Sequence, residues 1–164
     1  MSTRILYATV AAALLLTANA GWAYDSQLAA SYAEMFAPVA GAKAGKEMHL
    51  IKVDAFVDGV KAGKEYVTLD VRTPAESGIF TMSLPNGLAI PVSELFRSQN
   101  LDRLPTDKPV IVVCKSGTRA SAVGTALRHI GFDNVLILKG GLKALTAYLD
   151  PKTSHTPVEK VAMH

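Results

Sequence analysis

The sequence predicts an α/β fold in which a parallel sheet of about five strands is flanked by helices on both faces. Between residues 49 and 149, short runs rich in Val, Ile and Leu alternate with segments of helical periodicity. The runs are continuously apolar, which is typical of parallel strands buried on both sides. A length of 164 residues is compatible with one such domain.

Residues 1–23 have the composition of a secretory signal peptide. Arg4 gives the first segment its positive charge, an apolar run follows over residues 5–16, and small residues come next. We expect cleavage after Ala23 or, alternatively, after Ala20. A membrane anchor is the competing interpretation, but the run is shorter than the roughly 18–20 apolar residues of a span. The mature protein is therefore expected in the periplasm or otherwise exported, without stable membrane insertion.

Residues 24–48 are expected to form one helix and a linker before the domain. Apolar residues at helical spacing predict the helix over residues 25–37, with Asp25 or Ser26 as its N-cap. The Gly-, Ala- and Lys-rich stretch at 38–48 predicts the linker. The spacing leaves open whether this helix packs on its own domain or on another chain.

The domain itself is placed at residues 49–149, and its strands are the short apolar runs. They cover residues 49–53, 67–71, 88–90, 110–113 and 135–138. The fourth run is the most apolar. Pro109 suits the position at its start, where Pro is tolerated in a sheet.

The predicted helices of the domain lie between and after these strands. They cover residues 55–62, a segment from Ser93 to near Asn100, residues 118–130 and residues 141–149. Asp54 and Ser93 are the expected N-caps of the first two, and Gly131 is the expected stop of the third. The polar residues 150–164 are predicted to be a flexible tail.

Composition excludes several classes of function. A single cysteine cannot form an internal disulfide, and it argues against a thioredoxin-like pair or a cysteine-rich metal site. The net charge of +3 is too weak and too scattered to indicate nucleic-acid binding. No ligand spacing joins the histidines, so neither a metal nor a cofactor is expected; they are His49, His129, His155 and His164.

The single cysteine, Cys114, stands where a reactive group is expected. It directly follows the strand at 110–113, and open parallel sheets place their sites at the carboxyl ends of strands. A predicted helix begins just after it, so unpaired N–H groups favour negative charge nearby. Gly117 allows a tight curl, while Lys115 and Arg119 add positive charge, and all of this favours a nucleophilic thiolate. The alternative is an inert cysteine that ends a core strand.

Four sequence stretches together resemble the rhodanese family. The active loop of that family, C-x-x-G-x-R, is similar to Cys114-Lys115-Ser116-Gly117-Thr118-Arg119. The others are Leu-Asp-Val-Arg-Thr-Pro-Ala-Glu at 69–76, Ile-Pro at 90–91, and Gly-Phe-Asp-Asn-Val with the following Leu-Lys-Gly-Gly at 131–141. The resemblance covers roughly residues 49–149 and implies a rhodanese-like fold.

The resemblance implies a ping-pong sulfurtransferase. Cys114 would take sulfane sulfur from an anionic donor, thiosulfate or a persulfide or polysulfide, and pass it to a thiol or cyanide. The backbone N–H groups from Lys115 to Arg119 would hold the sulfur and the donor, and Arg119 would also orient the donor. Asp70 and Arg72 either brace the loop or line the pocket, or they form a purely structural ion pair or turn cap.

Two alternatives to free sulfur transfer remain. Cysteine phosphatases and arsenate reductases of this fold have one more residue between Cys and Arg, because phosphate is bulkier than a sulfur atom. Here the spacing is C-x4-R, and Val113 stands where phosphatases commonly carry a histidine. The other alternative is a low-turnover persulfide carrier or binding module that serves an exported partner.

One segment departs from the family pattern. The family usually has an aromatic residue and a Gly-His-Ile stretch after its first motif, whereas residues 77–87 read Ser-Gly-Ile-Phe-Thr-Met-Ser-Leu-Pro-Asn-Gly. The apolar stretch 77–90 is either a repacked core edge or a functional surface, which would be a docking surface for an exported protein partner or an apolar wall of the substrate pocket. It leaves the expected chemistry intact and the substrate open.

Overall fold

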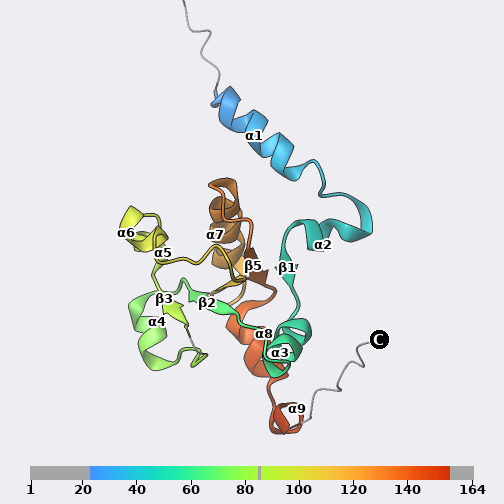
Figure 1. The fold of residues 1–164 in the computed structure, drawn as a ribbon, viewed down its shortest axis with the longest axis vertical. Helices are drawn as coiled ribbons and strands as arrows, with labels where there is room; N and C mark the ends of the chain where they lie inside the picture. The colour runs from blue at the N-terminus through green and yellow to red at the C-terminus, as the bar shows by residue number, and fades with distance from the viewer. Residues whose placement is uncertain (1–22, 85, 156–164) are drawn as a thin grey trace, which may run out of the picture.

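The computed structural model describes residues 23–84 and 86–155. One parallel sheet, with the strand order β1-β5-β4-β2-β3, forms its centre (Figure 1). Its strands are β1 (Leu50–Ile51), β2 (Val67–Asp70), β3 (Leu88–Ala89), β4 (Val110–Val113) and β5 (Val135–Leu138). The predicted fold class is confirmed. The predicted signal peptide, except Ala23, and the tail from residue 156 onward lie outside the described residues.

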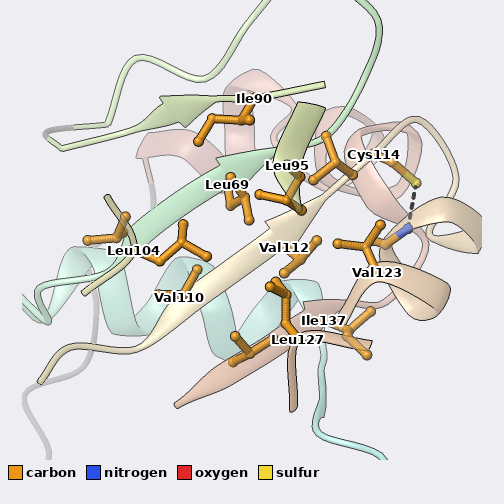
Figure 2. Packing of buried hydrophobic residues seen from close by; sticks show 14 residues of the cluster. Leu69, Ile90, Leu95, Leu104, Val110, Val112, Cys114, Val123, Leu127 and Ile137 are labelled. Carbon is orange, nitrogen blue, oxygen red and sulfur yellow. Dashed lines mark hydrogen bonds between the residues drawn. The ribbon is translucent and has the colours of Figure 1, made fainter. Parts of the chain in front are cut away.

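Successive residues of the central strand β4 face opposite layers of helices. Val112 packs into a cluster with α5 (Val92–Leu95), α6 (Ser98–Leu101) and α7 (Thr118–His129), which Figure 2 shows in part. Val113 packs into a second cluster with α3 (Val53–Lys61) and α8 (Gly141–Tyr148). Because β4 is fully buried by both layers, its carboxyl end is held rigidly.

The pairing register brings two predicted site segments together. Asp70, the last residue of β2, lies opposite Val113, the last residue of β4. The residues that follow these strands, including Cys114, therefore meet at the carboxyl edge of the sheet.

Helix α1 (Ser26–Phe36) projects from the domain and contacts it at the end of α7 (Figure 1). The Asp25 carboxylate accepts the N–H groups of residues 27 and 28, which confirms this residue as the N-cap. Ser31 Oγ lies 2.8 Å from His129 Nε2, and the Tyr32 ring stacks on His129 with centroids 4.1 Å apart. The helix thus contacts its own domain although none of its residues is buried. None of the helices in the described ranges is long and apolar enough to cross a membrane.

Helix α3 and strand β1 differ most clearly from their predicted bounds. Helix α3 starts at Val53 with Lys52 as N-cap, so Asp54 lies in its first turn and accepts the N–H of Ala55 instead of capping the helix. Strand β1 is shorter than the predicted 49–53, because it pairs with β5 alone at the edge of the sheet.

Three further segments contain helices that differ from the prediction. The helix expected after Ser93 is two short helices, α5 with N-cap Pro91 and α6 with N-cap Arg97, whose backbone is extended. Asn100 Nδ2 of α6 donates to the Glu94 carbonyl of α5 at 2.8 Å and joins the two. The linker 38–48 contains a 3₁₀ turn, η1 (Gly41–Lys43), and α2 (Ala44–Glu47). The expected loose tail begins with α9 (Pro151–His155), where the Asp150 carboxylate accepts the Thr153 N–H.

Candidate active site

Two backbone N–H groups of the loop and the following helix point at the Cys114 sulfur. Cys114 directly follows β4, and the residue is 1% exposed. Sγ accepts the N–H of Gly117 at 3.2 Å and that of Ala120 at 3.4 Å, the second drawn as the dashed line in Figure 2. Backbone donors that converge on one atom favour negative charge at that atom.

The loop curls inward because its carbonyl groups are held from outside by α8. The carbonyl of Cys114 accepts the Leu142 N–H at 2.9 Å, and that of Lys115 accepts the Lys143 N–H at 2.9 Å. Gly117 has φ of +93° and turns the chain into α7. The first N–H groups of α8 are thereby satisfied, and the N–H groups of the loop are free to face the sulfur.

The close approach of α8 to the loop requires the pair Gly140-Gly141. Both residues have positive φ, +79° and +58°. A Cβ on Gly141 would lie 2.8 Å from Gly117 N and 2.9 Å from the Lys115 carbonyl carbon, and would also overlap the Cys114 carbonyl oxygen. Only glycine at position 141 lets the helix N-terminus reach the loop.

Asp70 and Arg72 form a buried ion pair beside the loop. Arg72 Nη2 donates to Asp70 Oδ2 at 2.7 Å, and the two residues are 7% and 4% exposed. The hydrogen bond to Asp70 raises the pKa of Arg72. Arg72 also donates to the carbonyls of Glu76 and Phe80, so it ties down α4 (Pro74–Ile79) and the residue after it. The structure pairs these two side chains with each other, and through the further contacts of Arg72 the pair holds α4 next to the loop.

Asp70→Ala is expected to lower the free energy of unfolding by about 3–5 kcal/mol, because the Arg72 guanidinium is then buried without its partner. Urea unfolding followed by circular dichroism measures the change. Glu65→Ala is the control, since it removes the exposed ion pair of Glu65 with Lys108 (2.6 Å) and should cost less than about 1 kcal/mol. Similar losses in the two variants would contradict the role assigned to the buried pair.

Arg119 binds Glu76 through both of its terminal nitrogens. Nη1 lies 2.8 Å from Oε2 and Nη2 lies 2.6 Å from Oε1. The Arg119 hydrogen bond, with help from the Thr73 N–H, holds the pKa of Glu76 well below its usual value. A carboxylate with a lowered pKa loses its charge only in strong acid, so the pair stays formed at neutral pH. In this structure Arg119 fastens the loop to α4, and its expected contact with the donor stays a prediction.

Glu76 was not among the predicted site residues. Its partner Arg119 is 43 residues further along the chain, and nothing local in the sequence joins them. The available signal was the pattern Thr-Pro-Ala-Glu at 73–76, which forms a capping box at the start of α4. That pattern fixes Glu76 at the first turn of a helix that the Asp70–Arg72 pair holds beside the loop.

The other predicted loop residues lie next to Cys114 in the same loop, and their side chains are exposed to solvent. Lys115, Ser116 and Thr118 are exposed, and the two hydroxyl groups lie 3.4 Å apart. What the loop presents to the sulfur is therefore its backbone. Among the residues that the structure describes, no group of His, Cys, Asp and Glu side chains could hold a metal ion.

The atypical segment 77–90 divides into a packed part and an exposed part. Met82 and Leu84 pack against the core cluster of α3 and α8, as expected for a repacked edge. Ile79 is 91% exposed and Phe80 is 50% exposed. A groove of about 350 Å³ separates residues 80–84 from α3 and α8. The exposed part lies at the end of the same helix that carries Glu76.

The protein is thus an α/β domain with one free, buried cysteine in a loop at the carboxyl edge of a five-strand parallel sheet. The family model described as Rhodanese-like domain matches residues 53–148. The chain therefore belongs to the family of rhodanese-like domains, as the sequence motifs indicated.

Known relatives place the chain in a general sulfurtransferase family. It is 31% identical to a sulfurtransferase of Allochromatium vinosum over 81 residues, which are 49% of this chain and 72% of the relative. It is 29% identical to the probable adenylyltransferase/sulfurtransferase MoeZ of Mycobacterium tuberculosis over 94 residues, which are 57% of this chain. The match spans only 24% of that relative.

Solved structures show the same fold. A rhodanese-related protein from Thermoplasma volcanium superposes with a TM-score of 0.53 at 29% identity, over 63% of this chain and 95% of that one. The rhodanese-like domain of an Anabaena protein gives a TM-score of 0.55 at 24% identity, over 66% and 84% of the two chains.

Proposed function

We propose that this protein is a sulfurtransferase that carries sulfane sulfur as a persulfide on Cys114. The donor is an anion such as thiosulfate, or a persulfide or polysulfide, and the acceptor is cyanide or a thiol. The observation that carries the proposal is the pair of N–H groups that meet at the buried Cys114 Sγ. The membership of the chain in a sulfurtransferase family supports it.

In the first half of the reaction, the Cys114 thiolate attacks the outer sulfur of thiosulfate. The sulfur–sulfur bond of the donor breaks, and sulfite leaves with the electron pair. In the second half, cyanide or a thiolate attacks the outer sulfur of the persulfide. The new sulfur–sulfur bond then breaks and returns an electron pair to Cys114. The loop N–H groups stabilise the negative sulfur at the start and the end of this cycle.

The structure favours sulfur transfer over phosphoryl transfer. A cysteine phosphatase needs its loop arginine to bind the oxygens of a phosphoryl group, and both terminal nitrogens of Arg119 already bind Glu76. The loop N–H groups of Gly117 and Ala120 already point at the cysteine sulfur. Hydrolysis of p-nitrophenyl phosphate is the assay that would revive the phosphatase alternative.

The test is an initial-rate study with thiosulfate and cyanide in which thiocyanate is measured. A ping-pong enzyme gives parallel double-reciprocal lines, whereas intersecting lines, or no thiocyanate with thiosulfate and polysulfide donors, would overturn the proposal. The exposed side chains of Ile79 and Phe80 favour a second candidate, a persulfide carrier for a protein partner. Full loading of Cys114 with slow turnover to cyanide would favour the carrier.

We also propose that the protein is exported, on the basis of the signal-like composition of residues 1–23. The mature chain would then begin at Gly21 or Tyr24.

Glu76→Gln is expected to lower the KM for thiosulfate severalfold. The substitution removes the negative charge that neutralises Arg119, so the guanidinium is free to attract the anionic donor. Initial rates at varied thiosulfate measure the effect. Thr73→Ala is the control, since it disrupts the capping box without changing a charge and should leave KM nearly unchanged. A KM that rises in Glu76→Gln would show that the pair serves only to position the loop.

A further inference from the structure

The carboxyl edge of the sheet around Cys114 carries four exposed lysines, which we call the lysine edge. They are Lys52, after β1; Lys115, after β4 and Cys114; Lys139, after β5; and Lys143, in the first turn of α8. Backbone hydrogen bonds join their positions. The Lys139 N–H donates to the Ile51 carbonyl at 3.0 Å, and the Lys143 N–H donates to the Lys115 carbonyl at 2.9 Å.

The charge of the lysine edge is not balanced by acidic neighbours. Two carboxylates at this edge, Asp70 and Glu76, are each bound by an arginine. Within residues 23–84 and 86–155, no ion pair joins a lysine of this edge to a carboxylate, and Asp54 is the acidic residue nearest along the chain to Lys52. The lysine edge therefore produces a positive potential beside the reactive sulfur.

A small donor anion cannot use the whole lysine edge. Neighbouring strands lie about 4.8 Å apart, so β1 is about 10 Å from β4 across the intervening β5. A thiosulfate whose outer sulfur meets Cys114 is too small to contact lysines from all three strand ends at once. Lys52 and Lys139 instead suit a ligand with several negative charges spread across three strand ends.

The apolar side chains on the other side of the loop indicate what kind of ligand this is. Arg119 joins the loop to Glu76 of α4, and α4 ends at the exposed Ile79, followed by Phe80. A polypeptide has acidic and apolar side chains that fit both sides, whereas a nucleic acid gains little from an exposed Ile. A flat lipid surface would cover the loop without delivering a thiol to Cys114.

We propose that the lysine edge binds an acidic polypeptide segment that presents the acceptor thiol to the Cys114 persulfide. The proposal rests on the sulfurtransferase function. The acceptor thiolate attacks the outer sulfur, and a sulfur–sulfur bond forms on the acceptor while that to Cys114 breaks. The electron pair returns to Cys114 as a thiolate, and the proton of the persulfide stays on the transferred sulfur, which leaves the acceptor as a persulfide.

The test compares two synthetic peptides that each contain one cysteine. In the first peptide two glutamates stand on each side of the cysteine, and in the second two glutamines stand there instead. Each is added to protein loaded with sulfur at Cys114, and transfer is followed by mass spectrometry. The glutamate peptide is expected to react at least about tenfold faster at low ionic strength, and this advantage should largely disappear near roughly 0.5 M salt. The rate to cyanide, measured in every sample, serves as the reference.

Two double variants test whether the faster reaction of the glutamate peptide depends on the lysine edge. Lys52→Gln combined with Lys139→Gln is expected to remove most of the preference for the glutamate peptide, relative to the cyanide rate. Lys46→Gln combined with Lys64→Gln removes the same charge from exposed lysines that precede β1 and β2, at the opposite edge, and should keep the preference. Fluorescence anisotropy of a labelled glutamate peptide with serine in place of cysteine measures binding without sulfur transfer.

The outcomes separate this proposal from the function on which it rests. Equal rates for the two peptides, a preference that salt does not change, or a preference that survives the Lys52 and Lys139 substitutions would overturn the acidic partner. The acidic partner would also be overturned if the protein bound anionic lipid vesicles and showed no preference between the two peptides. Failure to transfer sulfur to cyanide as well would instead refute the sulfurtransferase function.

Discussion

Cys114→Ala is expected to reduce thiocyanate formation from thiosulfate and cyanide by about 10³-fold or more, to the uncatalysed level. The reason is that no other cysteine in the chain can carry the sulfur. The fold should survive, because the change removes one small buried side chain and costs about 1 kcal/mol. Thiocyanate assays give the activity, and circular dichroism with urea unfolding gives the stability.

Cys114→Ser is the matched variant for this prediction. A serine hydroxyl can accept the N–H groups of Gly117 and Ala120 in place of the sulfur, so the loop keeps its donors satisfied. It cannot carry sulfane sulfur, and it should be as inactive as the alanine variant. Turnover near the wild-type rate in either folded variant would refute the assignment of Cys114 as the sulfur carrier.

Gly141→Ala is expected to destabilise the protein by about 2–4 kcal/mol and to remove most of the sulfur transfer. The added Cβ would overlap the Cys114 carbonyl oxygen and approach Gly117 N at 2.8 Å. Helix α8 must then move away, which breaks the hydrogen bonds from Leu142 and Lys143 that hold the loop carbonyls. Urea unfolding and the thiocyanate assay measure the two effects.

Gly63→Ala is the control that separates the effect of steric overlap in Gly141→Ala from the effect of backbone strain. Gly63 has φ of +78°, and a Cβ there would meet nothing within 4 Å. This variant should lose about 1–2 kcal/mol of stability, because an L-residue is strained in the left-handed region. Its sulfur-transfer activity should be unchanged, because the loop around Cys114 is not altered. Equal destabilisation in the two variants, with activity retained in both, would mean that the approach of α8 does not set the loop geometry.

Much of the fold could be predicted from the sequence because its signals are local. The run Val110–Val113 is continuously apolar, and it became the central strand. The same run places Cys114 at the carboxyl edge, and the Asp25 N-cap was readable from its neighbours. Each of these features depends on residues close together in the chain.

The features that escaped prediction depend on contacts between distant segments. Glu76 enters the site through Arg119, and Gly141 is required because α8 packs on the loop from outside. Helices α5 and α6 are joined across their break by a side-chain hydrogen bond from Asn100 to the Glu94 carbonyl. Sequence spacing alone does not predict such pairings, because the partners come together only when distant segments pack in the folded protein.

The persulfide on Cys114 can be detected by the intact mass of the purified protein, measured before and after thiosulfate and then after cyanide. We expect thiosulfate to add the mass of one sulfur atom and cyanide to remove it, and we expect neither change in Cys114→Ala. The same spectrum shows whether the chain begins at Gly21 or Tyr24. No gain in mass with thiosulfate or with a polysulfide would contradict the persulfide on Cys114.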